Sequence, residues 1–156
     1  MRPPARLCAI IGLAAALIAP TAARAACTVS SAGVAFGAYD PLSGTPDDSI
    51  GTVSSTCTIL DPAPEVEIGA GNSGTFTTRR MSNGGSNLNY NLYTNAGRTI
   101  VWGNGSGGTG TVTMSGGTPV LFFWRTYSAT IYGRIPAGQN VTAGSYADTL
   151  IIQVNF

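Results

Sequence analysis

The sequence contains no histidine and no lysine, and charged residues make up only 10% of its 156 positions. Acid–base and nucleophilic catalysis rely most often on histidine, lysine or a free thiol, so this scarcity argues against an enzyme. Nucleic-acid binding needs a basic stripe that contacts phosphates, and the few arginines do not form one. We therefore expect no catalytic residue, no cofactor and no nucleic-acid partner.

Closely spaced acidic residues occur at two places, Asp47–Asp48 and Glu65 with Glu67. In an extended strand Glu65 and Glu67 point to one side, while Val66 and Ile68 point to the other. A glycosidase pair is the functional alternative for the two glutamates. We interpret them as a solvated strand face, because exposed acids are far commoner than catalytic pairs.

Long hydrophobic runs are also scarce, and the apolar run near the N-terminus covers only residues 7–19. Two arginines precede it and the small-residue sequence Ala23–Ala25 follows it, which is the three-part layout of a secretory signal peptide. A membrane anchor would need about twenty apolar residues. We therefore predict a signal peptide at residues 1–25 and one mature domain at residues 26–156.

The sequence has only three cysteines, and Cys8 would leave with the signal peptide. Cys27 and Cys57 remain as an even number in an exported protein, for which a disulfide is the default. A metal site is the alternative, but two thiols without histidine supply too few ligands. A lipoprotein is a further alternative for Cys27, although Arg24 occupies the position where a lipobox has a leucine-like residue.

No part of the predicted mature domain shows the apolar spacing of a helix, whereas alternation with a period of two occurs in several short segments. Residues 88–92 alternate apolar side chains with asparagine, and Val66 and Ile68 flank Glu67. A further segment would place on one face Val53, Ser55, Cys57 and Ile59. Turn sequences rich in proline, glycine and aspartate separate these segments, which predicts an all-β antiparallel sandwich or barrel.

The C-terminal segment 146–156 is predicted to be one strand, whose apolar face carries Leu150, Ile152, Val154 and Phe156. A strand this apolar is normally buried between two neighbours, yet no further strand follows it in the sequence. An open apolar edge is an aggregation hazard. Either the fold closes itself, or a partner supplies the missing strand.

Eight features in order along the chain resemble the spore coat protein U domain family, to which the subunits of archaic chaperone-usher pili also belong. None is diagnostic alone, and they occur in order between Cys27 and the final strand, which ends at Phe156. They are Cys27–Val29, Phe36–Pro41, Cys57, Arg80–Met81, Leu88–Tyr93, Trp102–Gly105, Tyr132–Gln139 and Gly144–Thr149.

The resemblance implies an immunoglobulin-like antiparallel β-sandwich of the pilin type that lacks its last strand. In such proteins a periplasmic chaperone inserts a strand into the gap, and a neighbouring subunit later replaces it. The strand-acceptor groove would then be lined by Leu150, Ile152, Val154 and Phe156. The implied partners are a periplasmic chaperone, an outer-membrane usher and neighbouring pilin subunits, and the implied destination is the cell surface or a fimbrium.

One feature departs from a polymerising subunit. Such a subunit donates a segment of about ten residues that precedes its first core strand. Only Ala26 stands between the predicted cleavage site and Cys27. We therefore expect this chain to accept a strand without donating one, which suits a fibre tip, a minor subunit or a non-polymeric role.

A run of aromatic residues, Phe122–Trp124, must send side chains to both faces of a strand. Core packing is one interpretation, and an exposed adhesive surface that includes Phe122 and Trp124 is the other. The leading hypothesis for the whole chain is a structural or adhesive fibre subunit. The alternatives are a self-complete spore coat or extracellular matrix protein and a carbohydrate-binding module.

Overall fold

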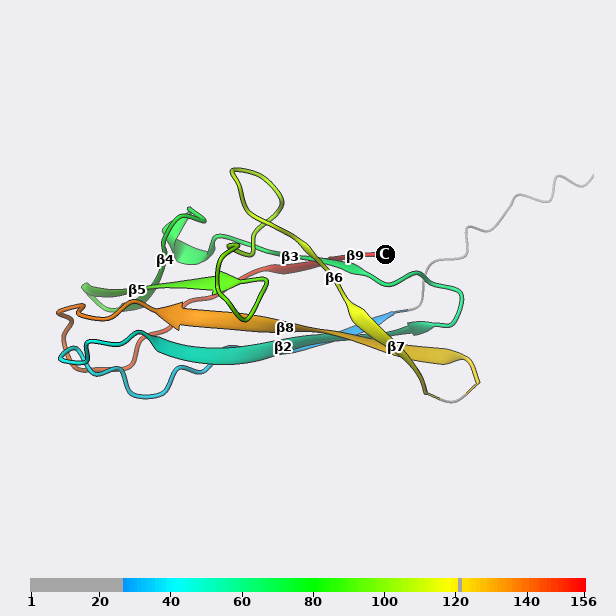
Figure 1. Cartoon of the computed structure of the whole chain (residues 1–156), viewed down its shortest axis with the longest axis horizontal. Helices are drawn as coiled ribbons and strands as arrows, with labels where there is room; N and C mark the ends of the chain where they lie inside the picture. The colour runs from blue at the N-terminus through cyan, green and yellow to red at the C-terminus, as the bar shows by residue number, and fades with distance from the viewer. Residues whose placement is uncertain (1–26, 121) are drawn as a thin grey trace, which may run out of the picture.

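The computed structural model describes residues 27–120 and 122–156, so the predicted signal peptide lies outside the described residues. The fold is a two-layer antiparallel β-sandwich (Figure 1). Its larger sheet has the strand order β1-β2-β8-β5-β4, with β7 also pairing with β8. These strands are β1 (Thr28–Ala32), β2 (Asp47–Thr58), β4 (Arg79–Asn83), β5 (Ser86–Tyr93), β7 (Ser115–Val120) and β8 (Trp124–Ile135).

The smaller sheet has the order β6-β3-β9. Its strands are β3 (Glu65–Ile68), β6 (Val112–Thr113) and β9 (Ile152–Asn155), and a short 3-10 helix, η1 (Gly71–Ser73), follows β3. All pairings between these named strands are antiparallel. The sequence-based prediction of an all-β antiparallel fold is therefore confirmed.

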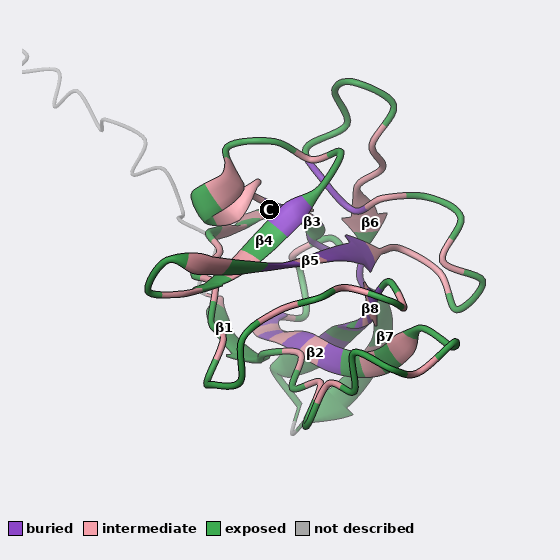
Figure 2. Cartoon of the chain, turned by 90° about the vertical axis from the view of Figure 1, so that its left-hand side faces the viewer, coloured by how far each residue is buried: buried purple, intermediate pink, exposed green. Residues whose placement is uncertain are grey.

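The long strands β2 and β8 form the centre of the larger sheet and pair along their whole length, from Asp47↔Ile135 to Thr58↔Trp124. Alternate side chains of β2 point into the sandwich, and Val53, Ser55 and Cys57 are buried as their spacing predicts. Figure 2 marks buried residues of β2 in purple. Ile59 differs from the prediction, because β2 ends at Thr58 and Ile59 is exposed.

The core lies between the two sheets and contains Ile131 of β8 together with Val66 and Ile68 of β3. Trp102 is fully buried, and its indole Nε1–H donates a hydrogen bond of 2.9 Å to the Val66 carbonyl. A buried indole needs such a partner for its polar group. This bond joins the loop that contains Trp102 to the smaller sheet.

A disulfide joins Cys27 and Cys57, in agreement with the prediction from the sequence. Cys57 is buried in β2, whereas Cys27 immediately precedes β1. The bond therefore holds the start of β1 against the end of β2, where the register pairs Thr28 with Thr56.

The C-terminal segment is a shorter strand than the sequence predicts. It pairs first with β4, through mutual backbone hydrogen bonds between Ala147 and Ser82, and later with β3, as β9. Between these pairings the Asp148 carboxylate accepts a hydrogen bond from the Thr149 backbone N–H. A local side-chain bond of this kind competes with a sheet ladder, which explains the interruption.

Candidate functional site

β1 and β9 are edge strands with one strand partner each within residues 27–120 and 122–156, and β4, β6 and β7 also have one strand partner each. β1 pairs only with β2, at the edge of the larger sheet, and β9 pairs only with β3, at the edge of the smaller sheet. A strand edge of this kind presents unpaired backbone N–H and C=O groups to a further strand.

The inward face of β1 is uncovered. Val29 pairs with Ser55 and Ser31 with Val53, and directly paired residues point to the same side of a sheet. Ser55 and Val53 are buried, so Val29 and Ser31 point into the sandwich as well. Both are nevertheless exposed, Val29 to 47%. Within the described residues, nothing from the opposite layer covers this end of the sheet.

Two cavities run from β1 along the segment that leads to β9. The first, of about 340 Å³, is lined by Ser31 of β1 and by Leu150 and Ile152. The second, of about 620 Å³, lies between the segments 34–41 and 141–146. The two cavities adjoin, because both are lined by Val34, Phe36, Met81 and Tyr146, and together they are named here the β1–β9 groove.

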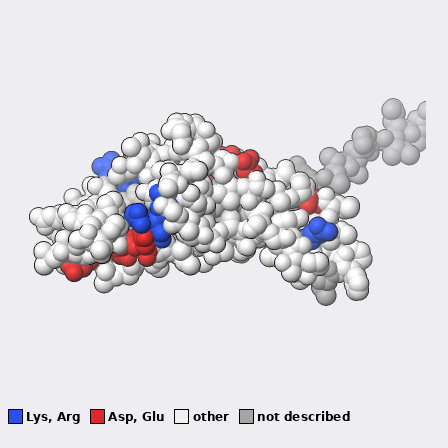
Figure 3. All heavy atoms as spheres, in the orientation of Figure 1, with Lys and Arg blue, Asp and Glu red and all other residues white. Residues whose placement is uncertain are grey.

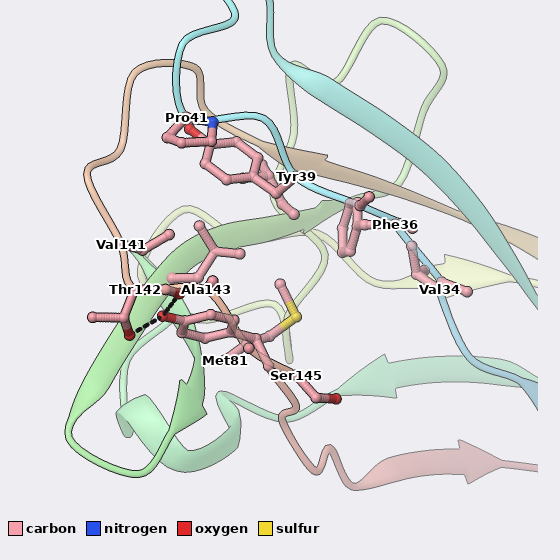
Figure 4. Close-up of a pocket in the computed structure, with 16 residues that line it drawn as sticks. Val34, Phe36, Tyr39, Pro41, Met81, Val141, Thr142, Ala143 and Ser145 are labelled. Atoms are coloured by element: carbon pink, nitrogen blue, oxygen red, sulfur yellow. Dashed lines mark hydrogen bonds between the residues drawn. The ribbon is translucent and has the colours of Figure 1, made fainter.

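Figure 4 shows the wider part of the groove, with Val34 and Phe36 on one side and Thr142 and Ser145 on the other. The Tyr146 hydroxyl lies 2.8 Å from both Ser86 Oγ and the Thr142 carbonyl oxygen. These contacts hold the Tyr146 ring, which lines both cavities, at the junction of the groove.

Asp148 fixes the wall of the groove next to β9. Its carboxylate accepts hydrogen bonds from the Asn72 backbone N–H (3.0 Å), the Thr149 backbone N–H (2.8 Å) and the Tyr90 hydroxyl (2.7 Å). Burial, together with the hydrogen bond to Asp148, raises the pKa of Tyr90 above its ordinary value, so the phenol stays protonated and donates. Asp148 is the one charged side chain among the described residues that line the two cavities.

The structure places the four predicted groove residues in three different environments. Leu150 and Ile152 line the narrower cavity. Val154 packs against the core without lining either cavity, and Phe156 is 49% exposed. Buried and exposed side chains alternate along β9 as expected, because Ile152 and Val154 are half-buried while the residues between and after them are exposed.

Sequence reasoning missed the opposite wall of the groove. Val34 and Phe36 come from the connection between β1 and β2 and are packed against the core. Their spacing of two residues is the available signal, since it is the alternation of an extended segment. Met81 and Tyr146 lie in motifs that carried the family resemblance, but nothing in those motifs indicated that both residues line one groove.

The groove wall depends on a glycine of β8. A Cβ atom at Gly133 would lie 2.6 Å from Phe36 Cζ and 2.7 Å from Val34 Cγ1. We expect Gly133→Ala to displace both side chains and to lower the free energy of unfolding by about 1–3 kcal/mol, the usual cost of overpacking. Urea unfolding measures this change, and Gly85→Ala is the matched control because nothing lies within 4 Å of its added Cβ. An equal decrease in the free energy of unfolding in the two variants would contradict the proposed role of Gly133.

The aromatic run Phe122–Trp124 lies at the turn between β7 and β8, away from the core. Phe122 is 89% exposed and Trp124 is 37% exposed. The Ile59 backbone N–H bonds to the Phe123 carbonyl (3.0 Å), which brings the exposed Leu60 region to the same end of the molecule. The structure therefore favours an exposed surface over core packing for these residues.

The described residues contain no group of three or more potential metal ligands, and none of their helices could cross a membrane. Glu65 is exposed, as expected for a solvated strand face, and Glu67 is half-buried. Glu67 Oε1 accepts a hydrogen bond from the Asn155 side-chain amide, so this carboxylate contacts β9.

Comparison with solved structures finds a similar fold in the CsuC–CsuE chaperone–tip adhesion subunit pre-assembly complex from the archaic chaperone-usher Csu pili of Acinetobacter baumannii. The TM-score is 0.52 at 22% sequence identity, with 85% of this chain aligned. The chain spans 40% of the length of the matched chain. At this identity the likeness concerns the fold alone.

Sequence comparison finds closer relatives. The curated Protein U of Myxococcus xanthus is 37% identical over 134 residues, which cover 78% of this chain and 70% of that protein. The sequence profile of the Spore Coat Protein U domain matches residues 13–153. The chain therefore belongs to the Spore Coat Protein U domain family.

Proposed function

We propose that this chain is a non-enzymatic subunit of a secreted bacterial surface fibre that is completed by a strand from another protein. A periplasmic chaperone would supply the strand first, and a neighbouring subunit would replace it when the outer-membrane usher assembles the fibre. The predicted signal peptide would direct the chain through the periplasm to the cell surface. The observation that carries the proposal is the β1–β9 groove, which is open between two singly paired edge strands.

The chemistry of the strand edges supports acceptance of a strand. The β7 edge contains a bulge at Gly116–Thr118 and then Pro119, which are features that protect an edge from further pairing. The sequences of β1 and β9, TVSSA and IQVN, contain no proline, glycine or charged residue. The two strands that border the groove are therefore open to pairing with a partner.

An adhesive role at the fibre tip is the finer part of the proposal. The exposed surface of Phe122, Trp124 and Leu60 gathers large apolar side chains at one end of the sandwich. Exposed apolar surface of this kind marks interaction sites in soluble proteins.

A spore coat or extracellular matrix protein is the second candidate. The observation in its favour is the 37% identity to Protein U together with the match to the Spore Coat Protein U domain. The two candidates differ in whether the groove is filled by another chain.

The test is expression of residues 1–156 with and without a cognate periplasmic chaperone, scored by soluble yield and by co-purification. We expect several-fold more soluble protein with the chaperone, and a stable complex. A soluble monomer that unfolds cooperatively without the chaperone, and does not bind it, would contradict strand acceptance and favour the self-complete coat protein.

Variants of β1 locate the binding strand. Ser31 lines the narrower cavity and is exposed, so Ser31→Trp should fill the groove with little effect on the core. We expect this variant to lose the chaperone complex. Ser30→Trp, one residue earlier and pointing away from the groove, should retain it. Equal capture of both variants would place the chaperone elsewhere on the molecule.

A further inference from the structure

The outward face of the larger sheet carries an ordered array of hydroxyl side chains. Directly paired residues point to the same side, so strand pairing aligns them in rows across β1, β2, β8 and β7. The first row is Thr28, Thr56, Thr126 and Thr118, the second is Ser30, Ser54, Ser128 and Ser115, and the third is Ala32, Thr52 and Thr130. We name these residues the hydroxyl face.

The hydroxyl face is regular and open to a ligand. Neighbours in a row are separated by about 4.7–4.9 Å, the strand spacing, and successive rows by about 6.6–6.8 Å, twice the rise per residue. Thr56 Oγ1 and Thr126 Oγ1 lie 3.2 Å apart. Within residues 27–120 and 122–156, the hydroxyl groups of Ser30, Ser54 and Ser128 form no hydrogen bond with another residue. Each hydroxyl group can both donate and accept.

The central part of this face is uncharged. Along β2 the outward residues from Thr52 to Thr58 are all threonine or serine, and the first acidic one, Asp48, lies beyond Ile50. Asp48 binds Arg134 through a pair of hydrogen bonds of 2.7 and 2.8 Å and forms an ion pair with Arg98 at 3.1 Å, so two arginines share one carboxylate at that end. Figure 3 shows charged side chains at a few separate places on a mostly uncharged surface.

The side chains of β8 that point away from the core begin and end with an aromatic residue. Trp124 and Tyr132 have the same orientation as Thr126, Ser128 and Thr130 because all are an even number of residues apart. Eight residues of extended strand place the Cα atoms of Trp124 and Tyr132 about 27 Å apart. Trp124 is 37% exposed, and the Tyr132 ring is half-buried beside the Arg98 guanidinium, 5.9 Å from its centroid.

We propose that the hydroxyl face binds a linear, uncharged polysaccharide that lies along β8 between Trp124 and Tyr132. Sugar rings combine an apolar face, which stacks on aromatic rings, with hydroxyl groups that pair with serine and threonine. The absence of charge along the row disfavours an anionic polymer. A row of side chains along one strand suits an extended chain better than a compact or branched ligand.

This site is separate from the β1–β9 groove, which opens on the inward side of β1. A strand bound in the groove therefore leaves the hydroxyl face free. Polysaccharide binding and strand acceptance can each fail without the other, and the two proposals are tested by different measurements.

The test is affinity electrophoresis of the exported protein, carried by its chaperone where needed, in gels that contain hydroxyethyl cellulose, galactomannan or laminarin. Sedimentation with insoluble cellulose and chitin extends the set. We expect retardation by at least one neutral polymer, little by alginate, and little change with added salt. Retardation by none of the neutral polymers, or salt-sensitive binding to alginate alone, would overturn the proposal.

Variants of β8 test whether the polysaccharide binds to the hydroxyl face. The triple variant Thr126→Val, Ser128→Ala and Thr130→Val removes the hydroxyl groups of β8 and retains side chains of similar size, and we expect binding at least tenfold weaker. Trp124→Ala should weaken binding by about tenfold, the upper range for one aromatic contact. Thr113→Val, an exposed threonine on the smaller sheet, should bind like the parent.

Two further results would overturn the proposal. The first is unchanged polysaccharide binding by the triple variant. The second is a concentration-dependent dimer of the parent that the triple variant loses, with no binding to any polymer, because the face would then be an interface between copies. A far-ultraviolet circular dichroism spectrum and a urea unfolding curve like those of the parent show that the triple variant folds.

Discussion

Replacement of Arg79 by alanine is expected to lower the free energy of unfolding by about 3–5 kcal/mol, the range seen when one partner of a buried charged network is removed. Arg79 is the first residue of β4 and is fully buried. Burial lowers the pKa of its guanidinium, a direction that reflects the cost of desolvating the charge. Hydrogen bonds to neutral groups, one aromatic ring and the nearby charge of Asp148 offset that cost.

The guanidinium joins the two layers of the sandwich. Its Nε and Nη2 atoms donate to the Gly69 carbonyl at 3.0 and 2.9 Å, and Nη2 also donates to the carbonyls of Ile68 (3.1 Å) and Trp102 (2.6 Å). Nη1 donates to Asn91 Oδ1 at 2.6 Å, and the Phe76 ring centroid lies 5.4 Å from the guanidinium carbon. Alanine would leave these buried acceptors unpaired, which is the costly outcome for a polar group.

Urea unfolding of the parent and the variant, compared in the same soluble form, measures the loss. Arg79→Lys should recover little of it, because one ammonium group cannot reach acceptors arranged around a planar fork. Arg80→Ala is the matched control, since the next side chain of β4 is exposed and its loss should cost less than about 0.5 kcal/mol. A stable Arg79→Ala protein, within 1 kcal/mol of Arg80→Ala, would show that the network contributes little.

Local alternation made the strands predictable, whereas contacts between distant segments were not. The alternation of Val53, Ser55 and Cys57 indicates a buried face without reference to any other strand, and the structure buries all three. Ile59 continues the same alternation, but its side chain is exposed because the chain turns after Thr58. Periodicity identifies a face, and it does not indicate where the pairing partner ends.

The buried arginine illustrates the same limit. Arg79 and Met81 are two residues apart in β4, so one apolar neighbour hinted that Arg79 points inward. Its acceptors are carbonyls of β3, the following turn and the Trp102 loop, which only the topology brings together. A charged residue in a strand is normally read as exposed, and burial becomes favourable here only because several carbonyls converge.

The groove was predictable at one wall and not at the other. Apolar alternation in the C-terminal segment indicated Leu150 and Ile152, which line the narrower cavity. The opposite wall comes from an irregular connection, where Val34 and Phe36 occupy space left by Gly133. Such a fit depends on the backbone distance between the segments, and no single-sequence pattern encodes that distance.

Reduction of the Cys27–Cys57 disulfide is the second change expected to have a large effect, because β1 has few other attachments. All five residues of β1 are exposed, and its ladder with β2 is its one strand pairing in the described part of the chain. The disulfide closes a segment with a sequence separation of 30 residues. In the chain-entropy model its loss lowers the free energy of unfolding by about 3–4 kcal/mol.

The functional consequence should exceed the loss of stability, because β1 is one of the two strands that border the groove. Without the covalent anchor at Cys27, the short ladder from Thr28↔Thr56 to Ala32↔Thr52 can open from its first residue, and the wall that receives the incoming strand is lost. We therefore expect the reduced protein to lose chaperone capture under conditions where its core strands still resist proteolysis.

Dithiothreitol treatment of the parent is preferable to replacement of Cys57, since substitution of this buried side chain would add a packing defect. Capture by the chaperone, measured before and after reduction and again after reoxidation, reports on the groove, and limited proteolysis of the same samples reports on the core. Capture that survives full reduction would mean that the ladder alone holds β1 in place, and the groove would then not depend on the disulfide.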